Sequence, residues 1–250
     1  TTDNYATATE RMRIDKTGKI GIGTDSPMNR LQLSHTAADG DNGLMIVRED
    51  TTTAADDLLG GIGFDSTDGN VPSSILEASA YVAGYASEDH GTGDKGGYLT
   101  FGTSSENDND DTTATERMRI TDEGNVGIGT ASPDSNLHIS SGTSGDCILT
   151  LEADTDNNNE DDNCFIIFKQ DGGLPFSAVY TGHNYLKISN GANANGGIIF
   201  LTGTTDNYAT ATERMRIDKT GKIGIGTDSP MNRLQLSHTA ADGDNGLMIV

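Results

Sequence analysis

The stretch ATERMRIDKTGKIGIGTDSPMNRLQLS, residues 8–34, decides how this chain folds, because the chain repeats it. The same letters return unchanged at 211–237, and a diverged copy, ATERMRITDEGNVGIGTASPDSNLHIS, occupies 114–140. Residues 204–250 as a whole are identical to residues 1–47, so the sequence repeat is 203 residues long. Folding does not require such identity, since most exposed positions tolerate substitution. The identity indicates a recent tandem duplication.

Polar and apolar residues alternate within the repeated stretch. The alternation covers Arg11–Ile14, Lys19–Gly23 and Leu31–Ser34, and a period of two predicts half-buried β-strands. Asp15–Gly18 has the length and the glycine of a hairpin turn. Thr24–Pro27 predicts a corner with room for a single helical turn, because proline lacks the N–H group that strand pairing needs.

Further apolar runs predict strands in two matching series. The first series is 43–47, 61–64, 79–84 and 97–103, and the second is 146–151, 164–168, 177–182 and 197–203. No segment has a sustained helical period. The sequence therefore predicts an all-β protein of tandem modules of about 100 residues: module A at 1–106, module B at 107–203, and at 204–250 the start of the next copy of module A.

The composition leaves little material for a core. Hydrophobic residues make up 33% of the chain and aromatic residues 5%, without any Trp, which is sparse for a globular domain. We expect the strand faces to be covered by neighbouring modules or by other chains. Gly21 and Gly23 would allow backbones to approach closely, although a twisted edge strand is the simpler alternative. The residues expected in this shared core are Met12, Ile14, Ile20, Ile22, Leu31, Leu33, Met118, Ile120, Val126, Ile128, Leu137 and Ile139.

The charge of the chain excludes some partners. With 38 acidic and 16 basic residues the net charge is −22, so nucleic acids and anionic membrane surfaces would repel it. No apolar run approaches the length of a membrane span, so membrane insertion is not expected.

Catalytic motifs are weak. Residues 91–96 spell G-x-G-x-x-G, but a predicted strand follows them where a dinucleotide site needs a helix. The histidines are scattered without zinc-site spacing. The sequence predicts no enzyme and no required cofactor.

Acidic loops offer one metal hypothesis. Asp154, Asp156 and Asn158 have the alternating oxygen spacing of a calcium loop, and Asp39 and Asp41 form a similar cluster. The first group is not an EF-hand, since Asn159 and Phe165 stand where Gly and Glu are needed. Structural calcium and a merely solvated acidic loop are both compatible with this pattern.

Two cysteines, Cys147 and Cys164, each lie at the start of a predicted strand. They are either small buried thiols or the partners of a disulfide within or between chains. A simple antiparallel hairpin would place two strand starts too far apart for a bond, whereas parallel strands would align them.

The order of the motifs resembles the repetitive shaft regions of bacteriophage and phage-derived tail-fibre proteins, which carry an E-R-M-R-I, G-N-V-G-I-G-T, S-P, L-H-V/I series. The matching residues are Glu116–Ile120, Gly124–Thr130, Ser132–Pro133 and Leu137–Ile139, with a weaker version at Glu10–Leu33. The resemblance implies an extended β-structured fibre, usually a parallel homotrimer. Such fibres often end in a self-cleaving chaperone domain or a receptor-binding tip, and this sequence shows neither, so cleavage and host recognition are not carried over.

The function predicted from these features is structural: a subunit of an extracellular or virion-associated filament that self-associates as a homotrimer or polymer. Its fold would be an elongated array, and a string of monomeric β-sandwiches is the alternative. The competing function is a fibrous adhesin that binds glycans or a cell surface, either with or without calcium. Its candidate contact residues are Tyr81, Tyr85, Tyr180 and Tyr185.

Overall fold

The protein is all-β, as the sequence predicts. The computed structural model describes residues 10–35, 43–66, 71–108, 112–153, 163–169, 175–182, 185–190, 196–203 and 211–237. Besides strands, these ranges contain one short 3₁₀ turn, η2 (Ile75–Glu77). The chain divides into two units, residues 1–147 and 148–250. Each unit is described separately below.

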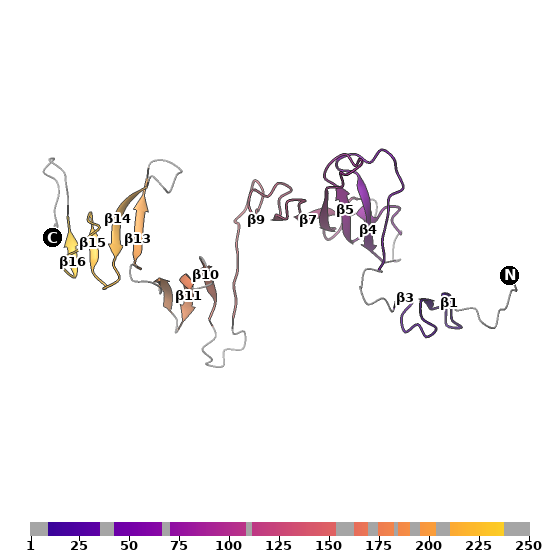
Figure 1. Cartoon of the computed structure of the whole chain (residues 1–250), viewed down its shortest axis with the longest axis horizontal. Coiled ribbons are helices and arrows are strands. Elements are labelled where there is room, and N and C mark those ends of the chain that lie inside the picture. The colour runs from indigo at the N-terminus through magenta and orange to yellow at the C-terminus, as the bar shows by residue number, and fades with distance from the viewer. Residues whose placement is uncertain are drawn as a thin grey trace. The chain divides into compact units, whose positions relative to one another are not determined.

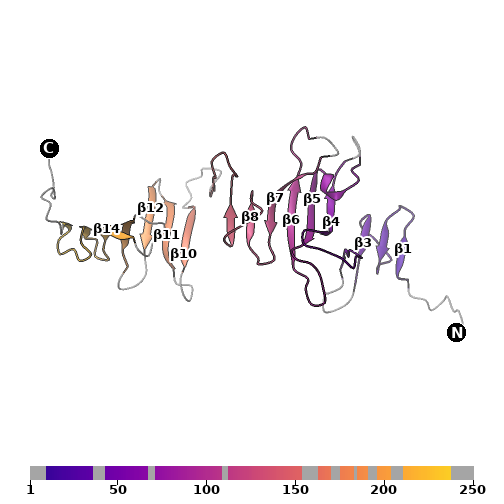
Figure 2. The ribbon, with the colours of Figure 1, turned by 90° about the horizontal axis from the view of Figure 1, so that it is seen from above.

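The largest sheet of the first unit has six strands in chain order (Figure 2). Its strands are β4 (Leu58–Phe64), β5 (Ala80–Ala86), β6 (Gly97–Thr103), β7 (Thr115–Ile120), β8 (Val126–Ile128) and β9 (Leu137–Ile139). Neighbouring strands are antiparallel except for β8 and β9, which are parallel. The sheet continues across residue 106, where the sequence repeat changes from module A to module B, so the sheet is not confined to one repeat module.

The first copy of the repeated stretch forms a three-stranded sheet of β1 (Met12–Ile14), β2 (Ile20–Ile22) and β3 (Leu31–Leu33). β1 and β2 form the expected hairpin, closed by a bond of 2.9 Å from the Asp15 N–H to the Lys19 carbonyl. Gly18 in this turn has φ +79°, which favours glycine. β3 then returns parallel to β2. The connection holds the predicted corner at Thr24–Pro27 but no helical turn.

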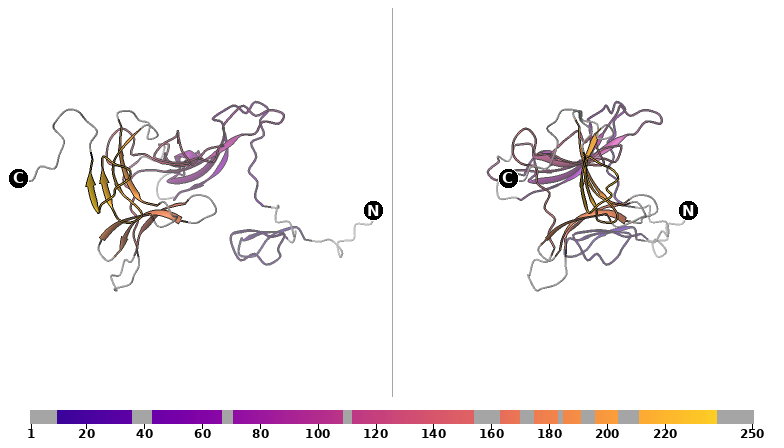
Figure 3. Two further views of the ribbon diagram at one scale, coloured as in Figure 1. Left: turned by 60° about the vertical axis from the view of Figure 1, so that its left-hand side comes forward. Right: turned by 90° about the vertical axis from the view of Figure 1, so that its left-hand side faces the viewer.

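The second unit contains two sheets. One is an antiparallel sheet of β10 (Phe165–Lys169), β11 (Pro175–Gly182) and β12 (Tyr185–Asn190). The other has the order β13 (Ile198–Thr202), β14 (Thr212–Ile217), β15 (Ile223–Ile225) and β16 (Leu234–Leu236), side by side in Figure 1 and seen from two other directions in Figure 3. In the described ranges the main contacts of each strand are with its sheet neighbours or with η2. Apolar residues on the faces of these sheets, such as Ile14, Phe64 and Ile225, are exposed, so the described residues do not form a sandwich of two facing sheets.

A small core covers one face of the six-stranded sheet. Its centre is Tyr81, Ala83 and Ala114, and two side chains of η2, Ile75 and Leu76, pack against it together with Leu58 and Tyr85. Tyr81 is only 5% exposed and lies opposite Gly102 on β6. A Cβ atom on Gly102 would be 2.1 Å from the Tyr81 ring, so the absence of a side chain there makes room for the buried aromatic ring.

Three sequence expectations about strands differ from the structure. Residues 43–47 and 146–151 were expected as strands, but the structure has no ladder at either segment. β12 was not expected, although Leu186 and Ile188 alternate with polar residues there. Apolar content alone predicted the first two segments, whereas pairing requires a neighbouring strand edge.

We predict that Gly102→Ala weakens the β5–β6 region by about 1–3 kcal/mol, because the added methyl group must displace the Tyr81 ring. Hydrogen exchange of peptides covering β5 and β6 would measure the loss. Gly43→Ala is the matched control, since a Cβ there meets nothing within 4 Å. Equal protection in both variants would contradict the proposed packing.

Candidate assembly interface

The repeated stretch places its apolar residues on one sheet face. Paired residues on adjacent strands point to the same side of a sheet, as do residues two apart within a strand. In the first copy Met12 pairs with Ile22, which pairs with Leu33, and Ile14 pairs with Ile20, which pairs with Leu31. All six side chains therefore share a face. Ile14 and Leu31 are 67% and 52% exposed, so the described residues do not cover this face.

The second and third copies extend the same arrangement over longer sheets. We call these surfaces the apolar faces. On the six-stranded sheet the apolar face comprises Ile62, Phe64, Val82, Leu99, Phe101, Met118, Ile120, Val126, Ile128, Leu137 and Ile139. On the other sheet it comprises Ile198, Phe200, Met215, Ile217, Ile223, Ile225, Leu234 and Leu236. None of these residues is fully buried in the chain.

The structure thus gathers the predicted shared-core residues on common faces and adds residues that the sequence analysis missed. Leu99 and Phe101 join the face from β6, and Ile198 and Phe200 join it from β13. The sequence predicts strands at 97–103 and 197–203, but the spacing of residues does not tell how these strands pair with the repeated stretch. Burial of these faces against another chain stays a prediction.

The opposite face of each repeated stretch is covered by the chain's own corner. Gly21 lies opposite Arg13, and a Cβ on it would be 2.6 Å from the Thr24 carbonyl oxygen. The equivalent distances are 2.4 Å at Gly127 and 2.6 Å at Gly224. The first glycine of the G-I-G motif is therefore required because the corner folds onto it. Gly21 is explained by the close approach of the corner backbone to the β2 backbone, and not by a twisted edge strand.

An aromatic and charged ladder supports this covered face in the second copy. The Arg119 guanidinium lies 4.6 Å from the centre of the Tyr98 ring and donates to Glu116 at 2.6 and 2.8 Å. Tyr98 stacks on Tyr85 and donates to the Asp56 carboxylate at 2.9 Å. Burial, followed by the hydrogen bond to this carboxylate, raises the pKa of Tyr98 to about 12. A tyrosine is neutral at physiological pH in any case, and the raised pKa keeps the phenol protonated, as a hydrogen-bond donor, to still higher pH.

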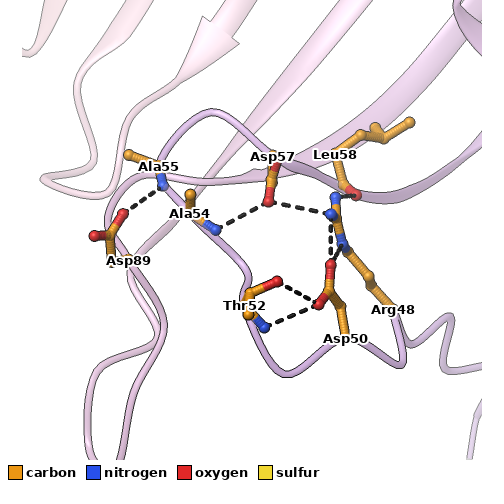
Figure 4. A network of polar contacts seen from close by, with 8 residues as sticks. All are labelled: Arg48, Asp50, Thr52, Ala54, Ala55, Asp57, Leu58 and Asp89. Carbon is orange, nitrogen blue, oxygen red and sulfur yellow. Dashed lines mark hydrogen bonds and ion pairs between the residues drawn. The ribbon is translucent and has the colours of Figure 1, made fainter.

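A second polar network fixes the segment that precedes β4 (Figure 4). Arg48 donates to the Asp50 carboxylate at 2.8 and 3.2 Å and to the Leu58 carbonyl at 3.2 Å, and it forms an ion pair with Asp57 at 3.1 Å. Asp50 also accepts from the backbone N–H and the hydroxyl of Thr52, each at 2.9 Å. The network joins the segment before β4 to the start of the sheet. Its charged groups bond to one another, so they are suited to a structural role.

The tyrosines of the adhesin hypothesis do not form one exposed group. Tyr81 lies in the core, so its expected role as an exposed contact residue is wrong. Tyr85 stacks on Tyr98, and Tyr180 stacks on Phe165. Tyr185 alone among them is largely exposed, at 70%.

Both cysteines are free thiols in the structure. Cys147 is exposed and lies outside any strand, and its Sγ contacts the Ile139 carbonyl at 3.3 Å. Cys164 is half-buried directly before β10, and its Sγ contacts the Leu151 carbonyl at 3.0 Å. The structure shows no disulfide between them, and the expected burial is not seen at Cys147. A bond between chains stays a prediction.

The calcium candidates Asp39, Asp41, Asp154, Asp156 and Asn158 lie outside the described residues. Within the described ranges no three His, Cys, Asp or Glu side chains are grouped to hold a metal ion. Structural calcium therefore stays a prediction. No helix in this part of the chain is long and apolar enough to cross a membrane.

The solved structures that are similar to this chain include two of a phage tail-fibre domain. One is the carboxy-terminal domain of the bacteriophage T5 L-shaped tail fibre, at 13% identity and a TM-score of 0.45, with 88% of this chain and 99% of that chain covered. The other is the same domain with its intra-molecular chaperone domain, at 13% identity and a TM-score of 0.44, with 86% and 67% covered. No family model and no curated protein matches the chain. A likeness at these scores identifies no family.

The Arg48 network predicts a specific acid response. The Asp50 carboxylate accepts hydrogen bonds from Arg48 and from Thr52, and these bonds lower the pKa of Asp50 from 3.8 to about 2. A carboxylate with a depressed pKa stabilises the fold above its ordinary pKa, and that contribution is lost as the pH falls from about 4 to about 2. An NMR titration of the Asp50 carboxyl carbon should have its midpoint near 2. Asp50→Asn should remove this part of the pH dependence, and a midpoint near 3.8 would contradict the network.

Proposed function

We propose that this chain is a structural segment of an extracellular or virion-associated fibre, in which copies associate through the apolar faces of their sheets. One observation carries the proposal: each repeated stretch covers one sheet face with its own corner and leaves the other face apolar and exposed. Contiguous exposed apolar surface of this kind marks a site of protein association. The resemblance of the repeated motif to tail-fibre shafts favours a parallel homotrimer as the form of this association.

The magnitudes favour a fibre over a single contact. Complete burial of an Ile or Leu side chain is worth about 1.5–3 kcal/mol, so a half-exposed one has roughly 1 kcal/mol still to gain. The six residues of the first copy would then contribute about 6 kcal/mol per chain. Association of two proteins costs about 4–15 kcal/mol in lost freedom. One copy is therefore marginal, but further copies on the same chain add burial without repeating most of that cost.

The proposed role is mechanical and needs no catalytic group. The acidic surface would keep the assembled fibre soluble and limit contacts with other anionic polymers. Self-association is the proposed partnership, and glycan binding is not favoured, because the candidate tyrosines are mostly used within the sheets.

We predict that Ile128→Lys together with Leu137→Lys makes the chain monomeric, because the charges would have to be buried in the interface. Native mass spectrometry and sedimentation would measure the assembly state. Ser132→Lys is the control, since Ser132 lies exposed in the corner and off the apolar face. If the protein without these substitutions is also monomeric at high concentration, assembly through the apolar faces is contradicted.

A further inference from the structure

The second and third copies of the repeated stretch hold an arginine in the same way. Arg119 donates to Glu116 at 2.6 and 2.8 Å, and Arg216 donates to Glu213 at 2.6 and 2.5 Å. Both arginines lie opposite the first glycine of the G-I-G motif, on the sheet face that the corner covers. The surroundings of the two guanidinium groups can therefore be compared position by position.

The two sites differ in what covers the guanidinium. The ring of Tyr98 lies over Arg119, at 4.6 Å. β13 pairs with β14 in the register in which β6 pairs with β7, so Gly197 occupies the place of Tyr98. A Cβ atom on Gly197 would be 2.6 Å from the Ile217 carbonyl oxygen, so a side chain at this position would require the backbone to shift. Among the described residues no aromatic ring lies over Arg216.

A cavity of about 530 Å³ lies beside Arg216 at this place. It is lined by Gly197, by Asp218 of the hairpin turn and by the corner at 228–231. The Arg216 side chain is held by its bonds to the Glu213 carboxylate and is 24% exposed. The cavity therefore has a fixed cation in its wall.

The neighbouring position on the added strand differs in the same sense. Thr100, opposite Arg119, is buried in the second copy, whereas Ile199, opposite Arg216, is 47% exposed in the third. Ile199 also lines the cavity. Among the described residues, the third copy thus lacks the aromatic cover that the second copy has.

The groups in the cavity suit a phenol ring. An arginine attracts the face of an aromatic ring, so a planar ring would lie against the Arg216 guanidinium. Ile199 would contribute apolar contact. The Asp228 carboxylate lines the cavity and would accept from a phenol hydroxyl, as the Asp56 carboxylate accepts from Tyr98 at 2.9 Å.

We propose that this cavity, which we call the ring socket (Gly197, Ile199, Arg216 and Asp228), binds a tyrosine side chain of a second copy of the chain, and that Tyr185 supplies it. Tyr185 lies at the turn end of the β11–β12 hairpin and is 70% exposed. The other tyrosines in the described part of the chain are buried or stacked on aromatic neighbours.

The contact would be head-to-tail. The ring socket and Tyr185 are different parts of the surface, so each copy can give its tyrosine to one neighbour and receive one from another. A single ring contributes little affinity, so Tyr185 would fix the relative position of copies that the apolar faces hold together. The role of Tyr185 therefore rests on the proposed fibre, whereas binding of a phenol in the ring socket does not.

N-acetyl-tyrosinamide tests the ring socket in the Tyr185→Ala chain, whose socket is empty in any state of assembly. We expect a saturable upfield shift of the Arg216 Nε–H resonance, because a ring over the guanidinium shields this proton. N-acetyl-leucinamide should cause no such shift. The Arg119 Nε–H resonance is the control within the same chain, since Tyr98 already covers that guanidinium. An unchanged Arg216 resonance, or an equal shift at Arg119, would overturn the proposal.

Photo-crosslinking tests the occupant. Benzoylphenylalanine in place of Tyr185, in a mixture of heavy and light isotope-labelled chains, should join a heavy chain to residues 197–199 or 216–222 of a light one. The same group in place of Leu186 is the matched control, since Leu186 is 73% exposed but lies on the opposite sheet face. Its yield at these residues should be severalfold lower.

Crosslinks that form only within one chain, or equal yields from the two positions, would overturn the assignment of Tyr185. If the chain does not assemble, crosslinks between copies are lost while the shift at Arg216 remains. A failure of the fibre is thereby distinguished from a failure of the ring socket.

Discussion

The structure depends on the unequal covering of its sheet faces. A β-strand presents alternate side chains to opposite faces, so each repeated stretch has two sheet faces that need to be covered. The corner at Thr24–Pro27 covers one of these faces by folding onto Gly21, and Pro27 is buried there. Among the described residues, none covers the apolar face on the far side of β1–β3. The apolar content is low in total but concentrated on these far faces, which is why a sparse composition still produces a surface fit for association.

The repeated stretch also shows how far local sequence determines a strand. One sequence forms a strand of three residues as β1 and of six residues as β14. Composition and propensity are the same in the two cases, so the difference comes from the neighbouring strand alone. Strand boundaries in this protein are therefore a property of pairs of segments.

This dependence on neighbours explains what sequence reasoning could and could not predict. Period-two alternation was sufficient for β1–β3, and the glycine of the Asp15–Gly18 turn was sufficient for the hairpin. The predicted strand at 146–151 is not observed, and among the described residues no strand pairs with this run. The role of Gly102 could not have been read from the sequence, since it depends on the register that sets Tyr81 against it. The sequence predicted the residues that the repeated stretch contributes to the apolar face. The residues that β6 and β13 contribute became known only from the observed strand pairing.

The chain-order arrangement of the six-stranded sheet has a consequence for tension. β4 and β9 are its two edges, so the polypeptide enters at one edge and leaves at the other. Hydrogen bonds between strands run perpendicular to the strands, so a pull on the two ends would act along these bonds and open the ladders one after another. Such a sheet resists stretching poorly by itself. Side-by-side packing of copies would have to carry the load, and mechanical strength would belong to the bundle rather than to its single threads.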